Sequence, residues 1–269
     1  LEQRLSKSPF HLSTLGGAVV FKARAQLPMR HRSTALVASL LLLLAAVDVW
    51  GLRFYVDPDP AKGDDRRSAG VAQNPDTPFR TITRALKIAH LVPQGRPHVI
   101  EIAAVTYSPS TGETLPLVIT QPDIFIEIAG DKEVFFNAQG KASFFHITAS
   151  GSEFLIQGFR LQNGSGDKGG AIFCQGCSLR VTNSRFFNNR ATSGGQAVYV
   201  EDGHLRFFNN EIVGGSDQVP GVAVVEVHNS LADTSQRDEV RNNTFFNSSG
   251  PAIRTSSSRI DINSNIFSE

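Results

Sequence analysis

Short apolar segments recur through the second half of the chain, and runs of Gly, Asn and Ser separate them. The unit Gly-x-Ala-[Ile/Val] begins at Gly169, Gly195, Gly221 and Gly250, at intervals of 26, 26 and 29 residues. A fixed period of this size is typical of proteins built from stacked repeats. The pattern therefore predicts a solenoid.

A second apolar series lies within the same repeats. Its first positions, the anchors, are Ile156, Val181, Phe207, Val240 and Ile262. The fifth residues after the anchors are Leu161, Phe186, Ile212, Phe245 and Phe267, which we expect to form one buried stack. The second residues after them are Gly158, Asn183, Asn209, Asn242 and Ser264, residue types that favour left-handed corners.

The sequence spacing between the Gly-x-Ala-[Ile/Val] units and the anchors is constant in most repeats. Ile172 precedes Val181 by nine residues, and Val198 precedes Phe207 by the same interval. Val224 precedes Val240 by sixteen, so the spacing predicts that about seven residues loop out in the third repeat. No repeat has a helical apolar period. We therefore predict an all-β fold, a right-handed, single-stranded parallel β-helix with coils about 4.8 Å apart.

The segment before the repeats predicts a cap. Residues 54–56 are typical of a first strand, and Thr77 followed by Pro78 predicts the start of a helix. Phe79, Ile82, Leu86 and Ala89 would share one face of that helix. Such a helix would cover the open end of the β-helix, where unpaired strand edges would otherwise be exposed.

The first 51 residues are expected to lie outside the fold. Met29 is followed by a basic start and an apolar run of about a dozen residues, a pattern typical of a secretory signal peptide; a retained anchor is the alternative. The predicted organisation is a non-native or read-through segment (1–28), a signal peptide (29–51), a cap with the first coils (52–131) and β-helix repeats that stop within a coil (132–269).

The charge of the remaining chain excludes one class of partner. Removing residues 1–51 removes six of the 26 Lys and Arg residues and two of the 25 Asp and Glu residues, which leaves a formal net charge of −3. No basic patch for nucleic acid is expected, and no transmembrane span is expected in the mature part.

Two cysteines, Cys174 and Cys177, lie three positions apart. An exported chain favours a disulfide between them, whereas two stacked free thiols are the alternative. One Cys-x-x-Cys motif without a second ligand pair is weak evidence for zinc.

The opening of the mature chain resembles a known family. Thr77-Pro-Phe-Arg-Thr-Ile82 and the segment 107–117 are similar to the domain of unknown function 1565, which begins many bacterial right-handed β-helix proteins of the pectin-lyase-like type. Family 9 pectate lyases begin in a similar way. The segments 169–172, 186–189 and 207–210 also resemble repeats of chlamydial polymorphic outer-membrane proteins.

Strand alternation places candidate binding residues on the wall. If Ile172, Val198, Val224 and Ile253 point inward, then Phe173, Tyr199, Val225 and Arg254 form one outward column. Two aromatic rings beside an arginine would offer sugar rings a flat surface. Glu226 falls in an inward column under this register, which favours the alternative that the aromatics belong to the core. A second column, Arg180, Arg206, Glu239 and Asp261, is expected to be a solvated face.

The resemblance to lyases implies a site for uronates. Such enzymes use calcium bound by several carboxylates, and a Lys or Arg as base. Glu201 and Glu226 are the candidate calcium ligands, with Asp202, Asp217 and Asp233 as further acids. Arg254 and Lys168 are the candidate bases.

Three classes of function remain open from the sequence. The chain is expected to be a secreted or cell-surface protein that binds or processes a polysaccharide or cell-surface glycan, as a lyase or a glycoside hydrolase if it is an enzyme. The alternatives are a non-catalytic, adhesin-like surface module and a structural module of a larger exported protein. The fold alone does not distinguish among these classes of function.

We expect the segment from Met29 to about Gly51 to be removed during export, because its charge and its apolar length match a signal peptide. N-terminal sequencing of the secreted protein should place the first residue near Gly51. Secreted protein that begins upstream of Met29 would contradict this expectation.

Overall fold

The computed structural model describes residues 11–15, 18–22, 51–92, 97–130, 133–150, 153–215, 218–228 and 237–268. The chain divides into two compact units, Leu1–Val49 and Trp50–Glu269. In the first unit, β1 (His11–Leu15) and β2 (Ala18–Lys22) pair as antiparallel strands. The predicted signal peptide lies outside the described residues, except for Gly51.

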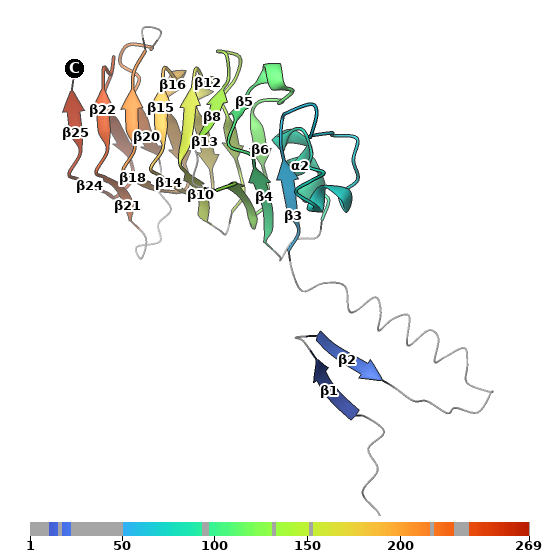
Figure 1. The fold of residues 1–269 in the computed structure, drawn as a ribbon. Coiled ribbons are helices and arrows are strands. Elements are labelled where there is room, and N and C mark those ends of the chain that lie inside the picture. Colours follow the sequence, from blue (N-terminus) through green and yellow to red (C-terminus); the bar gives the residue numbers. More distant parts are fainter. Residues whose placement is uncertain are drawn as a thin grey trace, which may run out of the picture. The chain divides into compact units, whose positions relative to one another are not determined.

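The second unit is the predicted parallel β-helix (Figure 1). Its six-stranded sheet contains β6 (Leu117–Ile119), β9 (Phe145–Ile147), β13 (Ile172–Gln175), β17 (Val198–Glu201), β20 (Val225–His228) and β23 (Ile253–Ser256). Its five-stranded sheet contains β10 (Glu153–Gln157), β14 (Ser178–Thr182), β18 (His204–Phe208), β21 (Asp238–Arg241) and β24 (Ile260–Asn263). Its seven-stranded sheet contains β5 (Thr106–Tyr107), β8 (Val134–Asn137), β11 (Phe159–Gln162), β15 (Arg185–Phe187), β19 (Glu211–Val213), β22 (Thr244–Phe246) and β25 (Ile266–Ser268).

Two smaller sheets complete this unit. The strands β3 (Arg53–Val56), β4 (His98–Ile102) and β7 (Ile124–Ile128) form a parallel sheet at the N-terminal end. The strands β12 (Ser165–Lys168) and β16 (Arg190–Gly194) pair in parallel between the seven-stranded and the six-stranded sheets along the chain. Each coil of the repeat region therefore contributes one strand to each of the three main sheets.

The predicted core stack is confirmed in register. Phe186 pairs with Leu161 on one side and with Ile212 on the other, and Phe245 continues the column. These four side chains are at most 2% exposed. Phe267 keeps the register but is 55% exposed in the last described coil, so the expectation that it is buried is wrong.

The corners between the five-stranded and the seven-stranded sheets follow the sequence pattern. Gly158, Asn183, Asn209, Asn242 and Ser264 all have φ between 49° and 75°, the left-handed region that Gly and Asn tolerate. After each corner except the one at Gly158, the next residue is a Ser or Asn whose side chain bonds to backbone groups of the preceding coil. We call the series Ser184, Asn210, Asn243 and Asn265 the asparagine ladder.

The asparagine ladder satisfies buried backbone groups on both sides of each corner. The Oδ1 of Asn243 accepts the backbone N–H of Asn210 at 2.9 Å, while its Nδ2 donates to the carbonyl of Phe207 at 2.9 Å. The Oδ1 of Asn265 accepts the N–H of Asn243 at 2.9 Å. Asn210 and Asn243 are at most 3% exposed, so water does not replace these bonds.

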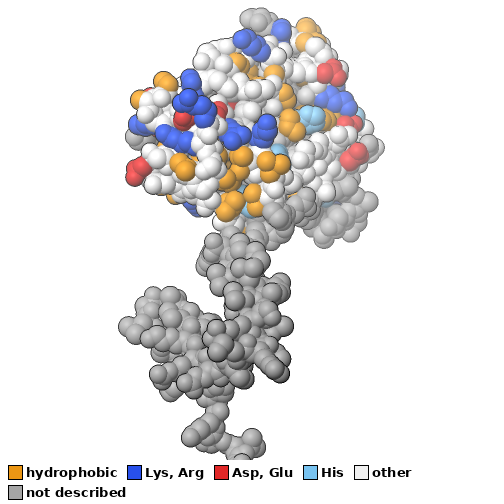
Figure 2. Space-filling model, turned by 90° about the vertical axis from the view of Figure 1, so that its right-hand side faces the viewer, with side chains coloured by type: hydrophobic (Ala, Val, Ile, Leu, Met, Phe, Trp, Pro, Cys, Tyr) orange, Lys and Arg blue, Asp and Glu red, His pale blue; other side chains and the backbone are white. Residues whose placement is uncertain are grey.

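The predicted helix is present but begins later than expected. α2 (Ile82–Ala89) has Thr81 as its N-cap, whose hydroxyl accepts the N–H of Arg84 at 3.0 Å. Thr77 is not the N-cap because Phe79 is extended and exchanges backbone hydrogen bonds with β3. α2 packs against β3, β4 and β6 and covers this end of the coils. Figure 2 shows that Lys and Arg side chains and hydrophobic side chains share the surface of this end.

Two carboxylates stabilise the start of α2. Asp65 accepts the N–H groups of Arg80 and Thr81, at 2.8 and 3.0 Å. The buried Glu113 accepts the N–H of Ile82 at 2.7 Å, and burial raises the pKa of its carboxyl group. The acidic loop 57–65 therefore contributes at least one carboxylate to helix capping.

In the third repeat, the residue equivalent to Ile172 and Val198 is Val225, not Val224. Val225 pairs with Val198 and with Ile253, so the corner at Gly221 contains one more residue than the equivalent corners. The loop predicted before Val240 falls largely on residues 229–236, which lie outside the described residues.

We expect Phe186→Ala to lower the free energy of unfolding by about 3–5 kcal/mol, because it leaves a cavity in a close-packed column. Chemical denaturation measures the loss. Phe187→Ala, a neighbouring side chain that is 52% exposed, is the control and should change stability far less. A loss below about 1 kcal/mol for Phe186→Ala would show that the column is not a packed core.

We expect Asn243→Ala to lower the free energy of unfolding by roughly 1–3 kcal/mol, since the buried amide of Asn210 and the carbonyl of Phe207 lose their partner. Asn265→Ala should cost less because Asn265 is only partly buried. Equal losses for the two variants, measured by the same denaturation, would show that burial of the ladder is not the cause.

Candidate functional site

The outer face of the six-stranded sheet brings most of the predicted site residues together. Strand register places six residues in one outward column: Val118, His146, Phe173, Tyr199, Glu226 and Arg254. Glu201 and His228 form the next outward pair along their strands. Phe173, Tyr199 and Arg254 therefore share a column, as predicted, whereas Val225 points inward.

The shift of the inward position from Val224 to Val225 reverses two expectations for the third repeat. Because side chains alternate along a strand, a change of one residue moves Val225 into the core and Glu226 to the outer face. Glu226 is thus the register partner of Tyr199 and not of Glu201. The two carboxylates predicted to bind one calcium ion belong to different columns.

Four rings follow one another on this face, and we call the series the ring stack. Tyr199 and His228 are stacked, whereas the other neighbouring rings meet tilted or edge-on. The ring centroids of His146 and Phe173 are 4.7 Å apart, those of Phe173 and Tyr199 are 6.0 Å apart, and those of Tyr199 and His228 are 5.5 Å apart. The two histidines are outside the predicted site. The signal that would have found His146 is its place in 144–147, where it follows an inward Phe as Phe173 follows Ile172.

Tyr199 is not the open surface that the sequence predicted. It is only 4% exposed because the end of β16 lies against its ring. A Cβ atom on Gly194 would lie 2.6 Å from Cε2 of Tyr199 and 2.9 Å from Oε2 of Glu226. Gly195 has φ of 60° and completes the close approach. Glycine at these two positions allows the backbone to cover the ring.

Glu226 is a buried acidic residue that lies between His228 and Arg254. It is 3% exposed, and its Oε1 lies 3.0 Å from Nε2 of His228. Its Oε2 lies 3.7 Å from a guanidinium nitrogen of Arg254 and accepts the N–H of Gly195 at 3.3 Å. Arg254 also donates to the carbonyl of Gly221 at 2.8 Å, which fixes its position.

A second ion pair lies beside the ring stack. The Nζ of Lys168 is 3.1 Å from Oε1 of Glu201 and 4.8 Å from the ring centroid of Tyr199. The hydrogen bond to Glu201 raises the pKa of Lys168, so the ammonium form is favoured. Burial raises the pKa of Tyr199, so its phenol stays protonated at neutral pH.

The arrangement does not fit a calcium ion. The carboxylate of Glu201 is paired with Lys168. The carboxylate of Glu226 already contacts His228 and Arg254. Among the residues that the structure describes, no group of three or more His, Cys, Asp or Glu side chains could hold a metal. Asp217 and Asp233 lie outside these residues.

The column on the five-stranded sheet is partly exposed, as predicted, and its members also form ion pairs. Arg180, Arg206, Glu239 and Asp261 occupy one register. Arg206 and Arg180 share Glu153, at 3.1 and 3.8 Å. This face carries no ring stack comparable to that of the six-stranded sheet among the described residues.

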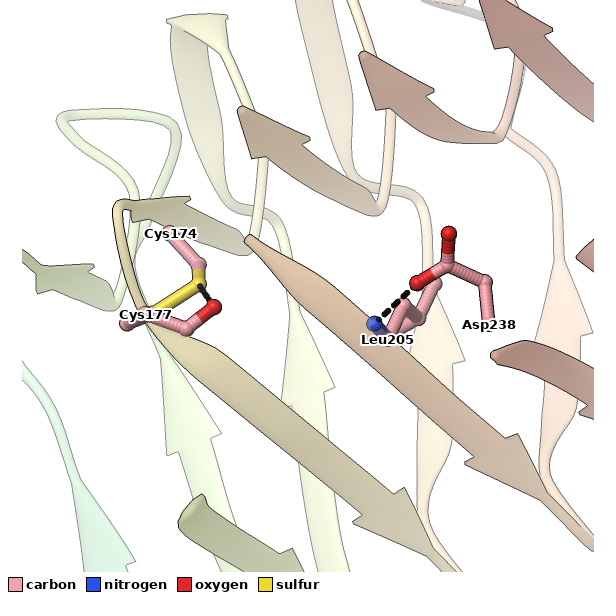
Figure 3. The surroundings of a disulfide bond; sticks show 4 residues. All are labelled: Cys174, Cys177, Leu205 and Asp238. Carbon is pink, nitrogen blue, oxygen red and sulfur yellow. Dashed lines mark hydrogen bonds between the residues drawn. A yellow bond between two sulfur atoms is a disulfide. The ribbon is translucent and has the colours of Figure 1, made fainter. Parts of the chain in front are cut away.

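Cys174 and Cys177 form a disulfide at the corner between β13 and β14 (Figure 3), with Cα atoms 5.8 Å apart. Both residues are at most 1% exposed, and Cys174 belongs to the inward column of the six-stranded sheet. The carbonyl of Cys177 accepts the N–H of His204, and the N–H of Leu205 donates to Asp238 at 2.7 Å. The disulfide is thus part of the packed corner and not of the outer face.

Comparison with known proteins identifies a family and no activity. No curated protein and no solved structure matches the chain. Within the described part of the chain, no helix is long and apolar enough to cross a membrane. The profile of the family described as protein of unknown function (DUF1565) matches residues 61–266, well beyond the segments 77–82 and 107–117 that carry the resemblance in the sequence. The match covers most of the 269 residues, so the chain belongs to the DUF1565 family.

Proposed function

We propose that this chain is an exported β-helix protein that binds an extended, uronate-containing polysaccharide along the outer face of the six-stranded sheet. One observation carries the proposal. Lys168 and Arg254 flank the ring stack, and their side chains remain 37% and 42% exposed. Two accessible cations beside aromatic rings are suited to a polymer that carries both carboxylates and sugar rings.

The geometry of the coils supports a polymer more than a small ligand. Equivalent positions recur about every 4.8 Å along the column, so successive coils offer contacts at a fixed spacing. Arg254 lies two coils beyond Tyr199 in the register. Phe173, which is half-buried, leaves part of its ring accessible for stacking in place of the covered ring of Tyr199.

Binding without cleavage is favoured by the state of the two candidate bases. A general base must be deprotonated to accept a proton. The hydrogen bond to Glu201 raises the pKa of Lys168, and an arginine stays protonated in proteins. Both cations are therefore hydrogen-bond donors to an anionic ligand, and a lyase reaction has less support.

A non-catalytic structural module is the second candidate. It is favoured by the burial of Tyr199 at 4% exposure and by the pairing of each cation with a carboxylate, since both features also stabilise a wall that binds nothing.

We expect the full chain to be retarded during electrophoresis through gels that contain polygalacturonate or alginate. Arg254→Ala and Lys168→Ala should each weaken this retention severalfold, because each removes a cation that can pair with a uronate. Calcium should not strengthen this retention, since the described residues do not fit that ion and calcium competes for the uronate carboxylates.

Matched controls come from the five-stranded sheet. Arg180 is 43% exposed and lies 3.8 Å from Glu153, close to the values for Arg254 and its pair with Glu226. Arg206 is 38% exposed with an ion pair of 3.1 Å, close to the values for Lys168. Arg180→Ala and Arg206→Ala should leave retention unchanged. Wild-type protein that binds neither uronate polymer would favour the structural module, whereas release of an ultraviolet-absorbing unsaturated uronide would show a lyase.

A further inference from the structure

The outer face of the seven-stranded sheet carries a second surface that the sequence interpretation did not include. Strand register places Phe187, Val213 and Phe246 in one outward column, which we call the apolar column. Phe187 is 52% exposed and Phe246 is 46% exposed. The column is bounded by the polar residues Gln162 and Ser268. Exposed apolar side chains that adjoin one another mark a contact surface, whereas apolar side chains scattered singly over a surface need no explanation.

The origin of the column is the repeated Phe-Phe-Asn sequence. In the strands β15 and β22, the first Phe enters the core and the second points outward. The same sequence at 207–209 lies on β18 of the five-stranded sheet, where the ring of Phe208 is half-buried and the guanidinium of Arg180 lies 5.8 Å from its centroid. The same sequence at 135–137 has the opposite orientation: Phe136 enters the core, and Phe135 is half-buried with the guanidinium of Arg160 4.9 Å from its centroid. Among the Phe-Phe-Asn repeats, the exposed rings are therefore Phe187 and Phe246.

Charged residues border the apolar column and balance one another. The outward column beside it contains Arg160, Arg185 and Glu211. Arg185 lies 3.0 Å from Glu211 and 3.9 Å from Glu133, and Arg160 also pairs with Glu133. Two arginines and two glutamates leave no excess charge. Arg160, Arg185 and Glu211, together with Phe187 and Val213, are among the residues that line a hollow of about 350 Å³.

The geometry points to a binding site for a neutral, extended polysaccharide of the β-1,4-linked type on this face. The balanced charges favour a ligand without net charge. Hydroxyl groups of such a ligand could accept hydrogen bonds from the arginine side chains and donate hydrogen bonds to the glutamate side chains. Phe187 and Phe246 are two coils apart, a distance of about 9.6 Å at the usual strand spacing. In a β-1,4-linked chain each sugar is turned over relative to the last, so the same face recurs at every second unit over a closely similar distance.

The small residue between the rings fits this spacing. Val213 is half-buried and occupies the intermediate coil, where a third Phe would fill the space of the intervening sugar. The site lies on a different sheet from Lys168 and Arg254, so it does not depend on the proposed uronate binding.

The test is affinity electrophoresis of the full chain in gels that contain hydroxyethylcellulose, with soluble starch and polygalacturonate as comparison polymers. We expect retention by hydroxyethylcellulose and not by starch, whose α-linked chain coils. Phe187→Ala and Phe246→Ala should each weaken retention about tenfold, and the double variant should abolish it. Phe187→Tyr should retain binding because it keeps the ring.

Two controls separate this site from the other face and from general loss of structure. Leu155→Ala changes a hydrophobic side chain that is 37% exposed on the five-stranded sheet, and Val118→Ala changes one that is 44% exposed on the six-stranded sheet; neither should affect retention by hydroxyethylcellulose. Wild-type protein that binds no neutral β-1,4-linked polymer would overturn the inference. It would also be overturned if the double variant bound normally but lost self-association in analytical ultracentrifugation, because the column would then be an interface between copies of this chain.

Discussion

The hydrogen bonds that join one coil to the next at the corner between the five-stranded and seven-stranded sheets constrain the rest of this fold. Each corner contains one left-handed residue, followed in most coils by a buried Ser or Asn of the asparagine ladder. Asn243 satisfies backbone groups of two neighbouring segments at once, so a coil that slipped by one residue would leave several buried groups unpaired. This corner therefore sets which side chains of both adjoining sheets face the core and which face solvent.

The same constraint explains how much of the structure could be predicted. Residues near the ladder, such as Phe186 and Phe207, were placed correctly because the corner always contains the same number of residues. The corner at Gly221 has no comparable ladder, and one extra residue there moved Glu226 to the outer face. The start of α2 was misplaced for a related reason. Thr77 has the local sequence of an N-cap, but the pairing of Phe79 with Tyr55 in β3 overrides that preference.

The candidate site depends on contacts that no single repeat encodes. Lys168 and Gly194 belong to the short β12–β16 sheet, yet they contact Tyr199 and Glu226 of the six-stranded sheet. Sequence alternation could place Tyr199 on the outside, but it could not show that a neighbouring backbone covers the ring. Gly195 was recognised only as the first residue of a repeat unit, and Gly194, which makes room for the aromatic ring, had no predicted role.

The two outer faces are separate surfaces of the same coils. Phe173 and Phe187 belong to one coil, and Glu226 and Phe246 belong to another, so each coil contributes to both faces. In a solenoid the stability of a coil depends mainly on its own interactions and on its two neighbours. A polymer that crosses several coils on one face would stabilise those coils by preferential binding to the folded form. It would thereby hold the residues of the other face in register without any direct contact between the two ligands.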